Sequence, residues 1–401
     1  MQFRTLRDQE VRGKRVVVRE DLNVPMKDGQ VGDPTRIVAA LETLRYLRDH
    51  GARTIVLSHL GRPDGKVVPA LSLQPVAKAL ASRLGTPVAF AADCVGPLAQ
   101  AAVAALRDGD VVLLENVRFH PEEEANDAAF AKALASLGQL YVNDAFGTAH
   151  RAHASTEGIA RDLPAVAGFL MEGELRALGA LVDDPKKPFV CAIGGAKVKD
   201  KVGVFTHLLD RVSAFVVGGG MANTFLAAQG IDVGSSLRDA DLEPAKEIVA
   251  LAAVRNVPLH LPTDAVVSTS FDADDAAATV PLSDIDGRMI LDIGPATAAA
   301  YATVLREART IVFNGPMGVY EKAPYREGTR TIGAAIAAAT RSGALSIVGG
   351  GDAAAAAHEL GFADAVSHVS TGGGATLEFL EGKTLPGVAA LERAAREQSA
   401  V

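Results

Sequence analysis

Short apolar segments rich in β-branched residues alternate with longer segments of helical period along the whole chain. Apolar runs of this kind predict buried strands. We expect such strands at 15–18, 54–58, 111–115, 140–144, 188–195, 214–220, 258–264, 288–295, 310–316 and 345–352. The segments 35–51, 73–85 and 124–138 each carry apolar residues on one helical face, and alanine-rich helices separate the later strands.

This alternation predicts an α/β fold in which each sheet is parallel and carries helices on both faces. With 401 residues, the chain is too long for one ordinary hydrophobic core. Segment 171–187 has a helical pattern that Asp-Asp-Pro breaks before a new strand. We therefore expect two Rossmann-like lobes, 1–170 and 188–384, joined by a hinge helix at 171–187. For the tail, 385–401, we expect a short charged helix that packs back on the first lobe.

Composition narrows the class of protein. A net charge of −8 argues against nucleic acid as a partner, although a local cationic cluster would still bind a small anion. Cys94 and Cys191 lie far apart in apolar surroundings, which predicts buried thiols in a reducing compartment. The chain shows no apolar leader and no apolar run of about 18 residues, so we expect a cytoplasmic protein with no membrane partner.

Arginines follow the predicted strands of the first lobe. Arg19, Arg62, Arg118 and Arg151 each come at or soon after the end of a strand. Because ligands of parallel sheets bind at the carboxyl ends of the strands, we expect these arginines to converge on one rim. Arg36 adds a fifth cation in the first turn of a helix, where it opposes the helix dipole. Any one of these five arginines alone could be a solvated surface residue, but the five together favour a phosphate or carboxylate ligand.

Glycine takes the place of arginine at the strand ends of the second lobe, at 194–195, 218–220, 315, 349–351 and 372–374. Glycines at such turns let backbone N–H groups approach phosphates beside a helix N-terminus. One such turn is equally compatible with tight packing, but several at one sheet edge favour a nucleotide. We expect 194–201 to open a helix, so that Lys197 and Lys201 share one face toward a phosphate chain. Asp352 is a candidate to hold Mg²⁺ together with phosphate oxygens.

Three local patterns suggest a metal site, a P-loop or a dinucleotide-binding turn, but each is weaker evidence than the arginines and glycines at the strand ends. His150 and His153 could ligate a metal, but they lie in a strand-end loop with no third His or Cys nearby in sequence. Since the arginines make a cation an unsuitable ligand, we expect both histidines to line or support an anion pocket. Gly382-Lys383-Thr384 lacks the upstream glycine of a P-loop, and 349–354 lacks the acidic partner of a dinucleotide fingerprint.

Nine ordered sequence blocks resemble the phosphoglycerate kinase family along essentially the whole chain. The first, VVVREDLNVP, looks like the family's N-terminal signature, and the others are SHLGRP, LENVRF, NDAFGTAHRAH, GGAKVKDK, GGGMANTF, NGPMGVYE, GGGD and SHVSTGGGA. The resemblance implies a two-lobed, monomeric hinge enzyme of glycolysis and gluconeogenesis. Its reaction would reversibly convert 1,3-bisphosphoglycerate and ADP to 3-phosphoglycerate and ATP, with Mg²⁺.

The resemblance also implies which residues bind each substrate. On the first lobe, phosphoglycerate would contact Asp21, Leu22, Asn23, Arg36, His59, Leu60, Gly61, Arg62, Arg118 and Arg151. On the second lobe, ATP or ADP would contact Gly195, Lys197, Lys201, Gly219, Ile290, Leu291, Asn314, Pro316, Glu321, Gly349, Gly350, Gly351, Asp352 and Ala353. Glu321 would accept hydrogen bonds from the ribose hydroxyls.

Catalysis in this interpretation needs no general base, because neither phosphoryl acceptor carries a proton that must be removed at neutral pH. Positioning and charge neutralisation then supply the rate enhancement. We assign the transferring group to Arg36 and Lys197, assisted by Mg²⁺ and by the helix N-termini at Gly350–Gly351 and Gly373–Gly374.

Two positions depart from the family's pattern. Ala353 stands where the family usually has Thr or Ser, which removes a potential hydroxyl contact to the nucleotide. Ile290 stands where the family often has Gly, and its side chain would press on the base pocket. Neither change removes a charged group, so we expect activity. The alternatives are a nicotinamide-dependent oxidoreductase, which would bind NADH, and a catalytically silent nucleotide-binding scaffold, which would not need the arginines.

Overall fold

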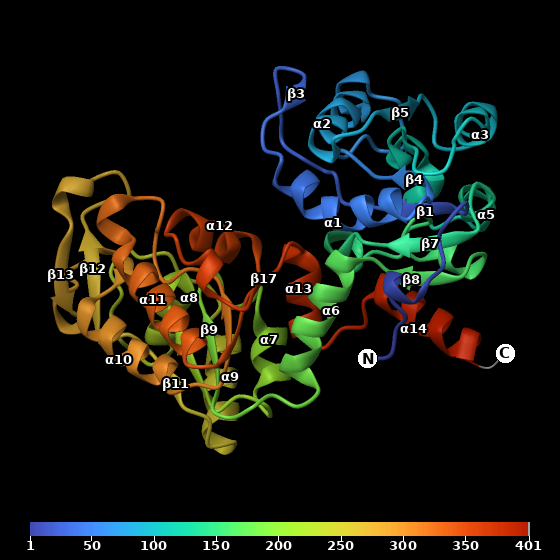
Figure 1. The fold of residues 1–401 in the computed structure, drawn as a ribbon. Helices are drawn as coiled ribbons and strands as arrows, with labels where there is room; N and C mark the ends of the chain where they lie inside the picture. The colour runs from blue at the N-terminus through green and yellow to red at the C-terminus, as the bar shows by residue number, and fades with distance from the viewer. Residues whose placement is uncertain (400–401) are drawn as a thin grey trace. The chain divides into compact units, whose positions relative to one another are not determined.

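The computed structural model describes residues 1–399 and divides the chain into two compact units (Figure 1). The first unit comprises Met1–Arg176 and the stretch that begins at Thr384, and the second comprises Ala177–Lys383. The division falls inside helix α6 (Phe169–Val182). Each unit contains a six-stranded parallel sheet, so the predicted α/β fold is confirmed. None of the described helices has the length and apolar character that a membrane span requires.

The sheet of the first unit has the order β5–β6–β4–β1–β7–β8. Its strands are β5 (Val88–Ala91), β6 (Val111–Leu114), β4 (Arg53–Leu57), β1 (Arg15–Arg19), β7 (Leu140–Asn143) and β8 (Ala165–Ala167). Arg19, at the end of β1, pairs in register with Leu57 and Asn143, the last residues of both neighbouring strands. The four strand ends that arginines follow in the sequence therefore share one edge of this sheet.

Helices cover both faces of this sheet. They are α1 (Thr35–Asp49), α2 (Gln74–Leu84), α3 (Gly96–Ala104), α4 (Pro121–Glu124), α5 (Ala128–Ala135) and α14 (Pro386–Ser399). Val16 and Val18 share a core with Leu44 of α1 and Leu80 of α2. Val17 points to the opposite face, because side chains alternate along a strand. The tail helix α14 packs against β8, within the first unit.

The sheet of the second unit has the order β11–β10–β9–β15–β16–β17. Its strands are β11 (Leu259–His260), β10 (Ala214–Val217), β9 (Phe189–Ile193), β15 (Thr310–Asn314), β16 (Leu345–Val348) and β17 (His368–Val369). Its helices are α7 (Val202–Leu208), α8 (Gly219–Ala228), α9 (Glu243–Val254), α10 (Pro295–Arg306), α11 (Glu327–Arg341), α12 (Gly351–Glu359) and α13 (Gly373–Leu380). Val216 faces the core of α10, α11 and α12, whereas the Phe215 ring packs on Phe205 of α7.

The predicted strand at 288–295 forms, but its place in a parallel sheet was wrong. It is β14 (Met289–Ile293), part of an antiparallel sheet with β12 (Asp264–Ser268) and β13 (Ala278–Pro281). Only short turns and 3-10 segments connect these three strands, and antiparallel pairing needs no helical crossover. A second small antiparallel ribbon, β2 (Met26–Lys27) and β3 (Gln30–Val31), belongs to the first unit.

The segment 194–201 does not open a helix, which corrects a second prediction. Helix α7 begins only at Val202. The Asp239 carboxylate accepts hydrogen bonds from the backbone N–H groups of Val198, at 2.8 Å, and Lys199, at 3.2 Å. These bonds satisfy the backbone in a loop conformation, so Lys197 and Lys201 do not share a helical face.

Candidate functional site

A network of hydrogen bonds holds Arg36 at the rim of the first unit. Arg36 Nη1 donates to Asp21 Oδ1 at 2.9 Å, to Asp21 Oδ2 at 3.0 Å and to the Asn23 carbonyl oxygen at 3.1 Å. Asn23 Oδ1 in turn accepts from the Gly61 backbone N–H at 2.8 Å. The Arg36 side chain remains 40% exposed, so one edge of its guanidinium is held while the rest is open to a ligand.

The other predicted arginines differ in exposure. Arg118 is buried, donates to the Gly61 carbonyl oxygen at 3.0 Å, and pairs with Glu124 at 3.3 Å. Burial lowers the pKa of Arg118, as does the charge of Arg19. Arg62 and Arg151 are exposed. The structure therefore links Asp21, Asn23, Arg36, Gly61 and Arg118 directly, with Arg62 and Arg151 following the same sheet edge.

Arg19 differs from the other four arginines that we expected on the rim, because its side chain is fully buried. Its Nε donates to Ser155 Oγ at 2.8 Å, and Ser155 Oγ donates to Glu123 Oε1 at 2.5 Å. Arg19 Nη2 lies 3.1 Å from His59 Nδ1. Since a guanidinium only donates, Nδ1 accepts this bond and neutral His59 carries its proton on Nε2. Arg19 thus orients His59, and sequence reasoning missed this role because the strand-end pattern does not report burial.

Both histidines that the charges surround are uncharged near neutral pH. Burial lowers the pKa of His59 well below its usual range, and Arg19, Arg118 and Arg36 lower it further. Burial lowers the pKa of His153 to about 4, together with the charges of Arg118, Arg19 and Arg151. His153 Nδ1 lies 3.9 Å from Glu123 Oε1. No metal-ligand group containing His150 or His153 occurs among residues 1–399.

Two fully buried carboxyl groups, those of Glu20 and Asp144, interact at the ends of β1 and β7. Burial raises the pKa of Glu20 well above its usual range, and the neighbouring Asp144 carboxylate raises it further. Burial raises the pKa of Asp144 to about 6, although the Met171 backbone N–H donates to Asp144 Oδ1 at 3.1 Å. Two adjacent buried carboxyl groups cannot both ionise readily, so one retains a proton at neutral pH.

Two predicted ligand residues of the first unit lie in its core. Leu22 and Leu60 are at most 1% exposed and pack with Val18 and Leu44. Leu22 donates its backbone N–H to Ser58 Oγ, and the Leu60 carbonyl oxygen accepts from Asn116 Nδ2. Their side chains therefore stabilise the rim from inside the fold and have no free surface for a ligand.

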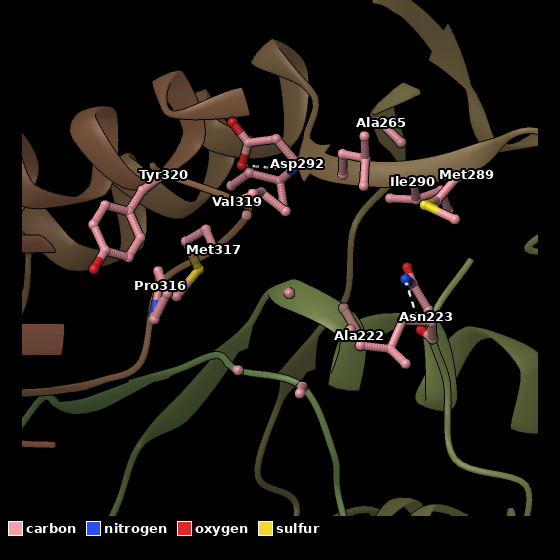
Figure 2. A pocket seen from close by; sticks show the side chains of 18 of the residues that line it. Ala222, Asn223, Ala265, Met289, Ile290, Asp292, Pro316, Met317, Val319 and Tyr320 are labelled. Carbon is pink, nitrogen blue, oxygen red and sulfur yellow. Dashed lines mark hydrogen bonds between the residues drawn. The ribbon is translucent and has the colours of Figure 1, made fainter. Parts of the chain in front are cut away.

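The second unit contains an apolar cavity of about 600 Å³. Its lining includes seven predicted nucleotide residues, namely Gly195, Gly219, Ile290, Leu291, Pro316, Glu321 and Asp352. Figure 2 shows Met289 and Ile290 of β14 opposite Ala222 and Asn223 of α8. A mostly apolar cavity with few polar groups suits a flat organic ring.

Sequence reasoning missed several residues of this cavity, including Asn223, Phe271, Met289, Met317 and Tyr320. These residues come from helix α8, from the β14 strand and from the loops around them. No local pattern marks them, because the antiparallel sheet that carries β14 was not predicted. Two sequence blocks could have drawn attention to some of them: NGPMGVYE holds Met317 and Tyr320, and GGGMANTF holds Asn223.

The glycine turns of the second unit serve two different purposes. A side chain at Gly194 would overlap the carbonyl oxygen of Pro316, so this glycine permits two loops to pack. Gly219 has a φ of +66°, and a side chain there would meet Gly195. By contrast, nothing lies within 4 Å of a side chain built at Gly351. Packing therefore does not require a glycine at position 351, and the missing side chain leaves space for a ligand.

Lys201 and Lys197 are in different environments. Lys201 Nζ donates to the carbonyl oxygens of Gly194, at 2.7 Å, and Asn314, at 2.6 Å, which joins the ends of β9 and β15. Burial lowers the pKa of Lys201 to about 8. Lys197 is exposed in the preceding loop. Asn314 Nδ2 donates to the Gly349 carbonyl oxygen at 2.7 Å, so Asn314 and Lys201 hold the strand ends in place.

The first turns of helices α12 and α13 face each other. Gly350 precedes α12 with a φ of +105°, and a side chain built at Gly373 would lie 3.1 Å from the Gly351 nitrogen. Gly374 is the second residue of α13. The backbone N–H groups of a first helical turn have no partner within the helix, so these two turns are a candidate site for an anion.

Asp352 and Ala353 follow in α12 but point to different surroundings. Asp352 is exposed and lines the cavity, so its carboxylate is an accessible hard oxygen ligand. The methyl group of Ala353 is fully buried in the core with Phe313 and Val348. Ala353 therefore offers only its backbone N–H toward the anion site.

Known proteins match the chain along nearly its full length. The model of the family described as "Phosphoglycerate kinase" matches residues 6–383. The phosphoglycerate kinase of Moorella thermoacetica is 56% identical over 96% of this chain and 98% of its own. That of Roseiflexus sp. is 53% identical over 98% of this chain and 100% of its own. Two solved phosphoglycerate kinase structures also match. That from Coxiella burnetii has a TM-score of 0.90 and 42% sequence identity, and the match covers 98% of this chain and 100% of that chain. That from Pyrococcus horikoshii OT3 has a TM-score of 0.82 and 33% sequence identity, and the match covers 99% of this chain and 100% of that chain.

Proposed function

Because the chain belongs to the phosphoglycerate kinase family, whose activity is phosphoryl transfer with a carboxyl group as acceptor, we propose that it performs this reaction with Mg²⁺. In one direction 1,3-bisphosphoglycerate and ADP give 3-phosphoglycerate and ATP, and in the other direction the reaction reverses. The observation that carries the proposal is the pair of facing helix N-termini beside an apolar cavity of about 600 Å³. Such a combination suits the phosphates and the base of one nucleotide.

The acidic substrate is assigned to the arginine rim of the first unit. Phosphoglycerate carries a carboxylate and a phosphate, and guanidinium forks bind both kinds of group in two-point contacts. Arg62, Arg118 and Arg151 supply this charge, and neutral His59 offers an N–H from Nε2. Arg36, anchored by Asp21, is assigned to the transferring phosphoryl group.

The nucleotide is assigned to the second unit. Ile290, Leu291 and Pro316 would contact the base, and Glu321 would accept from the ribose hydroxyls. Lys197 and the first turns of α12 and α13 would neutralise the charge that moves between the substrates. Lys201 and Asn314 would hold the strand ends in position, since their side chains donate hydrogen bonds to backbone carbonyl oxygens.

The donor set also fits Mg²⁺. Asp352 presents one exposed carboxylate at the cavity, and Mg²⁺ in such sites is held by one or two carboxylates together with substrate phosphates. When bound, the ion would neutralise phosphate charge. All other contributions to catalysis would come from protein groups, which bind the substrates, orient them and exclude water.

Transfer requires that the two substrates meet and that water is excluded. We therefore propose that the two units close about α6 when both substrates bind. X-ray scattering in solution tests this step: the radius of gyration should fall with both substrates present but not with either alone. An unchanged radius with both substrates would contradict closure.

We also propose that the protein acts as a monomer in the cytoplasm, with small molecules rather than nucleic acid or membranes as its partners. The net charge of −8 disfavours nucleic acid. Gel filtration with light scattering should give a mass near 41.5 kDa, that of one chain. A dimer mass would contradict the monomer.

The reaction itself is tested with Mg-ATP, 3-phosphoglycerate and hydroxylamine, which traps an acyl phosphate as its hydroxamate. Hydroxamate should require both substrates, should disappear with EDTA and should return with added Mg²⁺. Folded protein that binds Mg-ADP but forms no hydroxamate would instead support a silent nucleotide-binding scaffold. A change in NADH fluorescence on binding would support the oxidoreductase alternative.

A further inference from the structure

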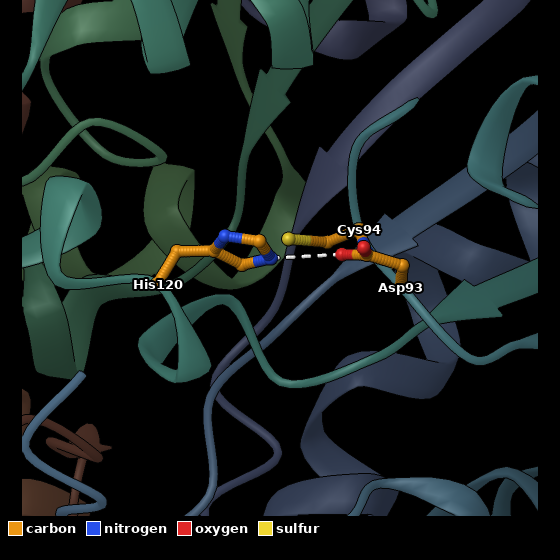
Figure 3. Close-up of side chains that lie close together, drawn as sticks. All are labelled: Asp93, Cys94 and His120. Atoms are coloured by element: carbon orange, nitrogen blue, oxygen red, sulfur yellow. Dashed lines mark hydrogen bonds and ion pairs between the residues drawn. The ribbon is translucent and has the colours of Figure 1, made fainter. Parts of the chain in front are cut away.

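A second cluster of chemically reactive side chains lies in the first unit, apart from the residues assigned to the substrate. Asp93 and Cys94 follow strand β5, and His120 follows the 3-10 turn Val117–Phe119. One ligand atom from each of these residues lies within 4.8 Å of the other two, and this is the only such group of three among residues 1–399. Figure 3 shows the Cys94 sulfur directed toward the His120 ring, next to the Asp93 carboxylate.

Contacts around the cluster hold the side chains of Asp93 and His120 in place. Asp93 Oδ1 accepts from His120 Nε2 at 2.8 Å and from the Cys94 backbone N–H at 2.7 Å. The His120 ring lies against Phe130, with 5.1 Å between ring centroids. Cys94 is fully buried, whereas the side chains of Asp93 and His120 are partly exposed. The cluster is therefore a held arrangement with one side open to solvent.

We propose that Asp93, Cys94 and His120 bind one Zn²⁺ ion, with water in the fourth position. Zn²⁺ binds thiolate sulfur at about 2.3 Å, imidazole nitrogen at about 2.0–2.1 Å and carboxylate oxygen at about 2.0–2.2 Å. A thiolate and an imidazole select Zn²⁺ over Mg²⁺ and Ca²⁺, which prefer oxygen ligands. The thiolate and the carboxylate carry two negative charges, which the ion balances.

Binding changes the protonation of the cluster. The Cys94 thiol releases its proton to solvent as the sulfur–zinc bond forms, and His120 keeps one proton on Nδ1 while Nε2 binds the ion. Affinity for the ion therefore increases as pH rises.

Three protein ligands and one water make an open zinc site, in contrast to the closed site of four protein ligands that is typical of structural zinc. The bound ion would connect the turn after β5 to the loop that follows Arg118. The first unit should then become more stable in the presence of Zn²⁺, since the ion binds the folded state alone. This inference does not depend on the proposed phosphoryl transfer.

Cobalt(II) provides the probe, because it occupies zinc sites and shows a thiolate charge-transfer band in the near ultraviolet. The full-length protein is freed of metal with EDTA, dialysed and titrated with Co²⁺ in the absence of nucleotide. We expect the band to saturate at one Co²⁺ per chain and to disappear when Zn²⁺ is added. Cys191→Ser is the matched control, because Cys191 is also buried but lies on β9 outside the cluster.

Cys94→Ser should lose the band, and His120→Ala should weaken Co²⁺ binding by at least about tenfold. Cys191→Ser should match the wild type. If Cys94→Ser does not fold, His120→Ala and Asp93→Asn, both at partly exposed positions, carry the test, with circular dichroism to verify folding. The proposal is overturned if the wild type shows no thiolate band, or if the band survives in folded Cys94→Ser. Either result would mean that the cluster is only a hydrogen-bonded His120–Asp93 pair next to a thiol that binds no metal.

Discussion

The two units carry their candidate anion sites at the carboxyl ends of their parallel strands, but the chemical groups of the two sites differ. The first unit uses long cationic side chains, with Arg36 anchored by Asp21 and Arg118 anchored by Glu124 and the Gly61 carbonyl oxygen. The second unit uses backbone N–H groups of α12 and α13, next to an apolar cavity. Side chains can match the shape of a small acid, whereas helix N-termini accept any phosphate chain. The difference suits one specific acidic substrate and one nucleotide.

Removing a cation from the first unit should have the largest effect. Arg36→Ala should lower kcat by about 10²–10³, because a preorganised donor to the transferring group is lost. Nucleotide affinity should remain within about twofold of the wild type, since Arg36 belongs to the other unit. Initial-rate kinetics and calorimetric titration with ADP measure the two quantities.

Arg45→Ala is the matched control for this change. Arg45 lies on the same helix α1 but donates to the Arg83 carbonyl oxygen, away from the strand ends. It should retain wild-type turnover. Near-normal kcat in Arg36→Ala would exclude Arg36 from the transfer step.

The exposed cation of the second unit should rank next. Lys197→Ala should lower kcat by about tenfold to a hundredfold, because backbone N–H groups still neutralise part of the phosphate charge. Its free energy of unfolding should change by less than about 0.5 kcal/mol, since the side chain is exposed. Lys199→Ala, an exposed lysine in the same loop, should leave both quantities unchanged. An equal loss of turnover and stability in Lys197→Ala would indicate a structural role instead.

Ile290 tests whether apolar contact contributes to the nucleotide site. Ile290→Ala should weaken ADP binding by about threefold to tenfold, because part of the cavity wall is lost. The KM for 3-phosphoglycerate should not change. Tighter ADP binding would show that the Ile290 side chain obstructs the base, as the family's frequent glycine at this position suggests.

The buried carboxyl pair gives the first unit a pH-dependent stability. The folded-state pKa of Glu20 lies above its unfolded value, so the folded chain holds an extra proton and stability falls as pH rises above about 4.5. Glu20→Gln removes this loss and supplies an amide N–H₂ group next to Asp144. At pH 8 the variant should therefore have a larger free energy of unfolding than the wild type.

Urea unfolding followed by circular dichroism measures this effect, because the chain has no tryptophan. The gain should shrink between pH 8 and pH 5. Glu42→Gln, at an exposed carboxylate, should show no such pH dependence. A Glu20→Gln protein less stable than the wild type at pH 8 would mean that the pair is ionised without cost.

Much of the fold follows from the sequence, for a physical reason. Buried parallel strands are continuous apolar runs, so β1, β4, β6, β7 and β9 stand out from the helices between them. The antiparallel sheet was not predicted, because its strands are not continuous buried runs: burial alternates over the first four residues of β12, and β13 has no buried residue. A charged loop such as 194–201 also misleads, since its conformation depends on Asp239, some 40 positions later.

The site was only partly predictable. Charges at strand ends mark the rim, yet the sequence cannot distinguish exposed Arg62 from buried Arg19. Glycines mark the turns, yet only the structure separates Gly194, which packs against Pro316, from Gly351, which has open space. The partner of each group decides its role, and partners come from distant parts of the chain.

The division of labour between the units is the central claim, and two exposed residues test it most directly. Arg151→Ala and Glu321→Gln change one residue in each unit without disturbing a buried group. Calorimetric titration of both variants with 3-phosphoglycerate and with Mg-ADP gives four affinities. We predict that Arg151→Ala weakens 3-phosphoglycerate about tenfold or more and leaves Mg-ADP within about twofold, and that Glu321→Gln does the reverse. Loss of both ligands in either variant, or the opposite pattern, would contradict this account.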